Sequence, residues 1–183
     1  MAKQGVLTGK FGEWLSAITH NSTSYTVYYD HGNKEAYKNV VATKGFVGDV
    51  VKNVNRLADI DILVADEESR IKMLIEIEER ASTPKKILGD VFSILLCNKF
   101  AVKQDGKQIY YTVHDHTKLI VAGVVSDKGA GLKKINDVVG PRIRKFSSPF
   151  KGIKPENVNL IFSGNIHNTI DELKKTVRKA IGV

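Results

Sequence analysis

The stretch from Ala58 to Glu78, ADIDILVADEESRIKMLIEIE, decides the fold. Residues 59–64 and 73–78 are rich in Ile, Leu and Val, and each run predicts a β-strand. Because only a short polar segment, 66–69, separates the runs, they predict an antiparallel hairpin. Acidic residues alternate with the apolar ones at a spacing of two, which places them on one face of the hairpin. These acids are Asp59, Asp61, Glu76 and Glu78.

The position of the turn decides which acids face each other. With the turn midway between the two runs, Asp59 lies opposite Glu78 and Asp61 lies opposite Glu76. Like charges directly opposite each other destabilise paired strands unless something compensates them. Carboxylates on adjacent strands are the ligands that a hard divalent cation such as Mg²⁺ prefers. The apolar residues between the acids take the other face, namely Ile60, Ile62, Ile75 and Ile77.

An ordinary hairpin offers a second interpretation of the same acids. Alternating polar residues are common on the solvated face of a strand. Arg56, Lys72 and Arg80 are near in sequence and could act as counterions. The acids alone leave both interpretations open.

The rest of the chain alternates between predicted strands and helices. Ser82-Thr83-Pro84 predicts a helix start, because the hydroxyl caps the helix and Pro fits its first turn. A helix through 132–139 is expected to end at Gly140-Pro141, and Thr169–Glu172 has a capping-box pattern that opens a final helix. Short strands interleaved with helices predict a single α/β domain with a mixed sheet flanked by helices. The other expected elements are a helix at 10–20 and strands at 25–29, 108–113, 119–125 and 158–162.

The composition is that of one folded domain. Of the 183 residues, 42% are apolar and 26% are charged, which argues against a disordered chain, collagen or a coiled coil. The formal net charge of +8 favours a polyanionic partner, and nucleic acid is the first to consider. We interpret the single cysteine, Cys97, as a small buried apolar residue. The apolar runs are too short to span a bilayer and no secretory signal follows Met1, so we expect no membrane partner and a cytoplasmic protein.

The hairpin and the helix after it resemble the PD-(D/E)xK nuclease superfamily. The resemblance covers residues 46–125: an Asp at the start of one strand, then an apolar strand ending in acid-x-acid, then a helix. It implies a restriction-endonuclease-like α/β core over 46–183, with residues 1–45 as an N-terminal extension of the same domain. Two positions depart from the family pattern: Ala58 replaces the leading Pro, and Glu78 replaces the usual Lys. In some members that Lys moves to the next helix, where this chain has Lys85 and Lys86.

The resemblance also implies roles for individual residues. Asp59 and Glu76 would bind the metal, Mg²⁺ or Mn²⁺, and Asp61 competes with Asp59 for the first role. Ile77 would lend its backbone carbonyl to the metal. One of Glu78, Lys85 and Lys86 would orient or deprotonate the attacking water. A divalent ion neutralises the phosphodiester and supplies hydroxide near neutral pH.

A basic segment lies in the second half of the chain. Residues 127–154 hold eight basic residues against two acidic ones. The part from Gly140 to Ser148 suits a loop lying along a phosphate backbone, although a solvated helix face is the alternative. The predicted nucleic-acid-binding residues are Lys128, Lys133, Lys134, Arg142, Arg144, Lys145 and Lys151.

An acidic metal pocket within a basic surface predicts a metal-dependent DNA endonuclease, of restriction type or acting in DNA repair or junction processing. The alternative is a nucleic-acid-binding protein that has a nuclease-like fold and does not cut, and RNA remains open as the ligand. A small-molecule enzyme using the Gly-rich segment near Gly129 is a third possibility. Because cutting two strands needs two sites, a homodimer is expected.

Overall fold

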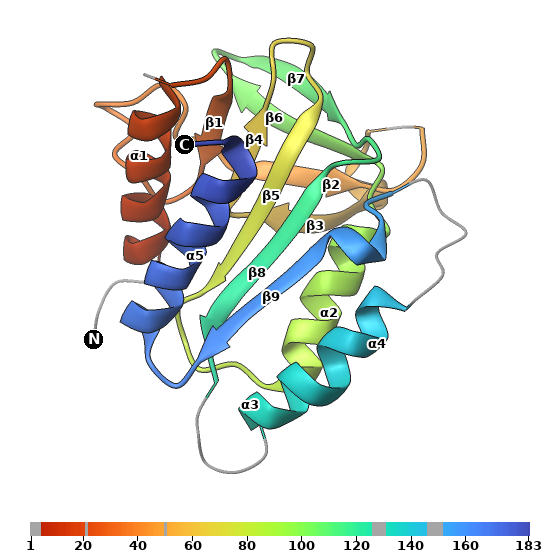
Figure 1. The fold of residues 1–183 in the computed structure, drawn as a ribbon. Helices are drawn as coiled ribbons and strands as arrows, with labels where there is room; N and C mark the ends of the chain where they lie inside the picture. Colours follow the sequence, from red (N-terminus) through yellow and green to blue (C-terminus); the bar gives the residue numbers. More distant parts are fainter. Residues whose placement is uncertain (1–4, 21, 50, 126–130, 146–151) are drawn as a thin grey trace.

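The predicted hairpin is present and organises the larger of two sheets in a computed structural model of the chain (Figure 1). The structure describes residues 5–20, 22–49, 51–125, 131–145 and 152–183. Strands β4 (Ile62–Ala65) and β5 (Ile71–Glu78) pair antiparallel, with Ile62 opposite Ile75. This is the register that the sequence predicts.

The expected single strand over 59–64 is wrong, because the chain changes sheets at Asp61. Residues before it form β3 (Arg56–Ile60), which pairs with β2 (Thr43–Phe46) in a second sheet. Asp59 therefore lies opposite Lys44, and not opposite Glu78 as predicted. The alternation of apolar and acidic residues continues through Asp61, so the local pattern does not reveal the crossover.

The larger sheet is mixed, as expected. Its order is β1 (Thr26–Tyr29), β4, β5, β8 (Lys118–Val124) and β9 (Val158–Ser163). Strands β1, β4 and β5 are antiparallel neighbours, whereas β5, β8 and β9 run parallel. In Figure 1 the arrowheads of the three parallel strands lie at the same, lower end of the molecule.

The second sheet is antiparallel, and the sequence did not predict it as a separate layer. Its order is β3, β2, β6 (Lys99–Gln104) and β7 (Lys107–Thr112). Of these strands, β7 was expected, and the expected strand over 59–64 overlaps only the end of β3. Strand β2 contains Lys44-Gly45, which interrupts its apolar pattern, and β6 has only a short apolar stretch.

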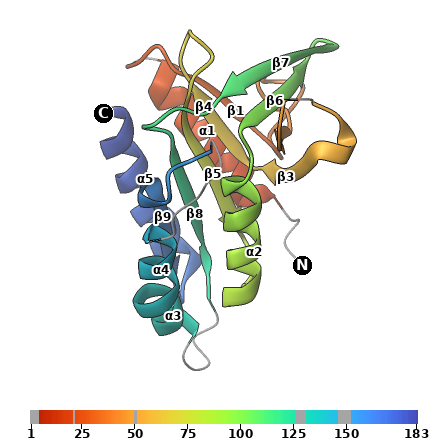
Figure 2. The ribbon, with the colours of Figure 1, turned by 90° about the vertical axis from the view of Figure 1, so that its right-hand side faces the viewer.

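Helices cover both faces of the larger sheet. Helices α1 (Val6–His20) and α5 (Ile166–Ile181) pack on one face. Helix α2 (Pro84–Leu95) and the second sheet pack on the other, and Figure 2 shows α5 and α2 on opposite sides of β5 and β8. Cys97 is buried, as predicted, among the apolar residues between the larger sheet, α2 and the second sheet. Burial raises the pKa of its thiol to about 12. The chain is thus one mixed α/β domain with two sheets flanked by helices.

Two expected helix boundaries are wrong. The helix over 132–139 continues through Gly140-Pro141, because a π-helical turn (Ile135–Val139) between α3 (Gly131–Lys134) and α4 (Gly140–Arg144) places Pro141 in a new first turn. Helix α5 begins at Ile166 with Asn165 as its cap. The Thr169 hydroxyl lies inside this helix and donates to the Gly123 carbonyl at 3.1 Å.

The start of α2 is as expected. The Thr83 side chain accepts a hydrogen bond from the Lys86 N–H at 3.3 Å, and Pro84 occupies the first turn. Short 3-10 turns at Asn53–Asn55 and Pro155–Asn157 lead into β3 and β9. Among the described residues, no helix is both long and apolar enough to cross a membrane.

Candidate active site

A cavity of about 580 Å³ lies at the carboxyl end of β5. Strand β3, one side of α2 and the start of α1 form its walls together with the segment that follows β5. In open α/β sheets, ligands bind beyond the carboxyl ends of the parallel strands, where this cavity lies. Its charged lining residues are Asp59, Asp61, Glu76, Glu78, Glu79, Asp90, Arg80 and Lys86.

Asp61 and Glu76 form a reciprocal pair at this end of the hairpin. The Asp61 carboxylate accepts the Ile77 N–H at 2.7 Å, and the Glu76 carboxylate accepts the Asp61 N–H at 3.3 Å. The register of β4 and β5 creates the pair, because Asp61 immediately precedes Ile62, which lies opposite Ile75. Each carboxylate is thus held in place by the other residue's segment of backbone.

This pair is electrostatically unfavourable. Burial raises the pKa of Asp61 to about 6, although the Ile77 N–H and the nearby His31 oppose the shift. Burial, and then the charge of Asp61, raises the pKa of Glu76 well above its usual range. Two buried carboxylates whose pKa values are raised in this way need a proton or a cation to compensate them.

The neighbouring carboxylates have partners within the protein. Glu79 accepts the backbone N–H groups of Gly5 at 3.0 Å and Thr8 at 2.8 Å, so it caps the start of α1. Asp59 is exposed and pairs with Arg56. These charges are compensated without any ligand.

Glu78 and Asp90 share one lysine. Glu78 pairs with Lys86 and accepts the Ser82 hydroxyl at 2.9 Å. Burial opposes ionisation of Glu78, but these hydrogen bonds outweigh it and lower its pKa. Burial raises the pKa of Asp90, and Lys86 Nζ lies 4.0 Å from Asp90 Oδ2, a buried atom with no hydrogen-bond partner in the described part of the chain.

The donor set fits a hard divalent cation. Carboxylate oxygens suit Mg²⁺ and Mn²⁺, and Asp61, Glu76 and Asp90 provide negative charge that the protein leaves uncompensated or only partly compensated. Within the described ranges, no group of three His, Cys, Asp or Glu side chains is spaced to hold a metal ion alone. Because Mg²⁺ keeps several waters and binds substrate phosphate, one or two carboxylates suffice.

The structure places the alternative candidates differently within and around the cavity. Asp61 lies beside Glu76, whereas Asp59 lies on another strand with its side chain 62% exposed. Lys86 lines the cavity, and the exposed Lys85 is not among the lining residues. Ile77 also lines the cavity, with its N–H donated to Asp61.

Sequence reasoning missed three residues of the cavity. His31 reaches it through a contact between distant segments, and Glu79, which follows β5 directly, bonds to the distant start of α1. No local pattern indicates either contact. Asp90 could have been predicted from the sequence. It follows Lys86 by four residues, so both lie on one face of the predicted helix.

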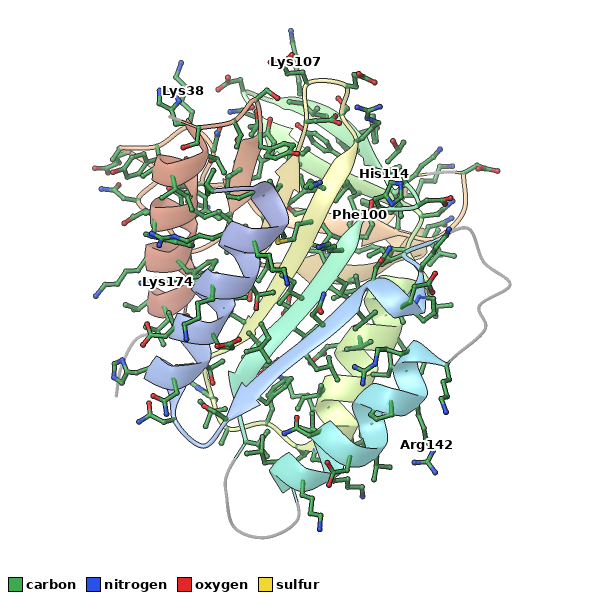
Figure 3. All side chains as sticks on the ribbon, viewed as in Figure 1. Lys38, Phe100, Lys107, His114, Arg142 and Lys174 are labelled. Carbon is green, nitrogen blue, oxygen red and sulfur yellow. The ribbon has the colours of Figure 1, made fainter. Side chains whose placement is uncertain are left out.

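The predicted basic surface is only partly a loop. Arg142 and Arg144 lie in helix α4, which corrects the expected loop over 140–148; the rest of that expected loop, 146–148, lies outside the described residues. Figure 3 shows Arg142 pointing outward from α4. Lys133, Lys134 and Lys145 are also exposed, while Lys128, Lys151 and Gly129 of the Gly-rich segment lie outside the described residues.

Comparisons with protein-family models, with curated proteins and with solved structures gave no match. The function is therefore inferred from the residues that meet in the cavity.

Proposed function

We propose that this protein is a metal-dependent DNA endonuclease with a restriction-endonuclease-like core. One observation carries the proposal: the uncompensated pair Asp61 and Glu76 lies in the same cavity as the Lys86–Glu78 ion pair. This combination provides a place for a divalent cation and a fixed positive charge beside it. Both are what hydrolysis of an anionic phosphodiester requires.

Asp61 and Glu76 would hold Mg²⁺ or Mn²⁺. When bound, the ion neutralises phosphate charge and lowers the pKa of a water molecule so that it can attack phosphorus. Lys86 adds a positive charge that stabilises the transition state. Burial alone would lower the pKa of Lys86, but its hydrogen bond to Glu78 raises it, so this lysine acts as a cation and not as a base. Glu78 positions Lys86 through their ion pair.

The order of elements supports the proposed core. Helix α1 comes first, Asp61 precedes β4, Glu76 and Glu78 lie at the end of β5, and α2 follows. Lys86 contacts Glu78, the position where the family has its usual lysine, so a lysine from the next helix reaches the same place. Exposed basic residues of the segment 131–145 offer a surface for the DNA backbone. Since duplex cleavage needs two such cavities, we propose a homodimer.

The test is cleavage of plasmid DNA, branched DNA and single-stranded RNA with Mg²⁺, Mn²⁺ or EDTA. Glu76→Gln removes the charge of the pair, and Glu67→Gln makes the same change at the exposed hairpin turn. We expect metal-dependent cutting by the wild type and by Glu67→Gln, and a loss of at least about 100-fold in Glu76→Gln.

Other outcomes would change the conclusion. Equal cutting by Glu76→Gln would show that the activity does not come from this cavity. Salt-sensitive DNA binding without cutting under any metal condition would favour the non-catalytic nucleic-acid-binding protein. Cutting of RNA alone would correct the substrate.

A further inference from the structure

His31 lies in the wall of the cavity on the side of α1. It follows β1 and shares the cavity with Asp61, Glu76 and Lys86, although it is distant from all of them in sequence. Helices α1 and α2 lie on opposite faces of the larger sheet. The cavity therefore has Lys86 on its α2 side and His31 on its α1 side.

The backbone of His31 is in the left-handed region, with a φ of 61°. The described residues contain two other non-glycine residues of this kind, Ser69 and Asp105, and both occupy hairpin turns, between β4 and β5 and between β6 and β7. A tight turn accounts for those two conformations. His31 lies in a bend after β1 and is the one among the three that lines the cavity. A non-glycine residue held in this conformation at a cavity points to function.

The surrounding structure holds His31 in this conformation. Its N–H donates to the Asp30 carboxylate at 2.8 Å. Two glycines of the α1 region leave room for it: a Cβ on Gly5 would lie 2.2 Å from the His31 ring, and a Cβ on Gly9 would lie 2.5 Å from the His31 carbonyl oxygen. The start of α1 is thus packed directly against this residue.

The imidazole remains available to a ligand. Its Nε2 lies 3.8 Å from the Asp30 carboxylate, beyond hydrogen-bond distance, and its side chain is 44% exposed. On the α2 side, Lys86 is paired with Glu78, and its ammonium has further N–H groups for a ligand. His31 therefore adds an imidazole hydrogen-bonding group to the α1 side of the cavity.

We propose that His31 contacts the substrate, with an imidazole N–H donating a hydrogen bond to a phosphate oxygen of a DNA strand that lies over Asp61 and Glu76. This inference rests on the proposed function, because it needs a phosphodiester in the cavity. The strand would be held between His31 and Lys86, and this placement would fix the phosphate before attack.

The test compares His31→Asn with the wild type. Asn tolerates the left-handed backbone, so this change removes the imidazole and keeps the conformation. Asp105→Asn is the matched control, with the same backbone region (φ 49°) at a hairpin turn. The probe is a fluorescein-labelled DNA duplex, with binding followed by anisotropy in Ca²⁺ and cleavage followed in Mg²⁺.

We expect His31→Asn to bind the duplex roughly ten-fold more weakly, as a lost hydrogen bond to a charged group predicts. Its kcat/KM should fall by at least the same factor, its thermal midpoint should stay at the wild-type value, and Asp105→Asn should behave as wild type. Unchanged binding by His31→Asn, an equal loss in Asp105→Asn, or a fall in thermal midpoint that accompanies the loss would overturn the inference. Binding without cleavage by the wild type would refute the proposed function, and the anisotropy comparison would still decide on His31. A wild type that does not bind DNA would refute both.

Discussion

The β4–β5 hairpin carries acidic residues at both ends, and the surrounding protein stabilises the charged form of the acids at one end and destabilises it at the other. At the turn, Asp66 accepts the Arg70 backbone N–H at 2.9 Å and its Nε at 2.8 Å, and Arg70 also reaches Glu68 at 2.9 Å. Slight burial opposes ionisation, but the bonds from Arg70 outweigh it and lower the pKa of Asp66. At the cavity, burial raises the pKa values of Asp61 and Glu76.

This difference separates acids that stabilise the fold from acids that work against it. Charge at the turn is matched by Arg70 and backbone N–H groups, so ionisation favours the hairpin. Charge on Asp61 and Glu76 destabilises the metal-free protein, and folding alone does not require it. Groups held in such a state within a cavity are candidates for a functional site, and the proposed cation would compensate them.

The largest difference between the two ends should be seen when their cations are removed. Lys86 and Arg70 each serve two acids, Glu78 with Asp90 and Asp66 with Glu68. Lys86→Ala should reduce Mg²⁺-dependent plasmid cleavage by about 100-fold, because it removes a charge beside the reacting phosphate. Arg70→Ala should lower the thermal midpoint and leave cleavage unchanged.

Lys85→Ala is the control for the position of the charge, since Lys85 is exposed on the same helix and does not line the cavity. Equal losses in Lys85→Ala and Lys86→Ala would assign the effect to the general charge of α2. A loss of cleavage in Arg70→Ala would remove the distinction between the two ends.

The hairpin was predictable because its information is local. A period of two fixes which side chains share a face, and the turn fixes the register, so Asp61 and Glu76 were placed together correctly. The crossover at Asp61 was not predictable, since it depends on β2. Gly45 weakens the strand pattern of β2, yet a Cβ there would lie 2.8 Å from Cys97 Sγ, so the glycine marks close packing and not a break.

The same limit applies to the candidate site: the carboxylates of the hairpin were predictable, and the residues that other segments bring to them were not. The choice between Lys85 and Lys86 depends on the rotation of α2 about its axis, which the hairpin sequence does not specify. Glu79 meets the start of α1 across more than seventy positions, at sequence separations of 74 and 71. His31 also lines the cavity because segments distant in sequence pack together, and the local sequence does not show such a contact.

The stability of the metal-free protein should depend on pH in opposite ways at the two ends of the hairpin. A carboxyl with a raised pKa keeps a proton that the unfolded chain has released, so the free energy of unfolding falls as pH rises from 3.8 through about 6 for Asp61. Glu76→Gln should therefore stabilise the metal-free protein at pH 8, on the order of 1–3 kcal/mol, because a Gln amide neither ionises in the buried site nor has to keep a proton that the unfolded chain releases. Asp66→Asn should destabilise it by about 1 kcal/mol through lost hydrogen bonds.

Urea unfolding in EDTA at several pH values measures both changes. The stabilising part that ionised Asp66 contributes is present above the ordinary value of 3.8 and is lost as the pH falls below it, opposite to the cavity pair. Added Mg²⁺ should raise the stability of the wild type at pH 8 and leave Glu76→Gln unchanged. Destabilisation by Glu76→Gln at pH 8 in EDTA would contradict the electrostatic difference between the two ends.

The smallest expected effect compares the surfaces beside the two ends. Figure 3 shows Arg142 in the lower half of the molecule, on the outer side of α4, and Lys107 at the upper end. If DNA lies over the cavity, Arg142→Gln should weaken DNA binding several-fold and reduce the slope of log affinity against log salt by about one. Lys107→Gln, which removes the same charge, should leave both quantities unchanged. Equal effects of the two substitutions in a salt titration would mean that the net charge of +8 attracts DNA without directing it to the cavity.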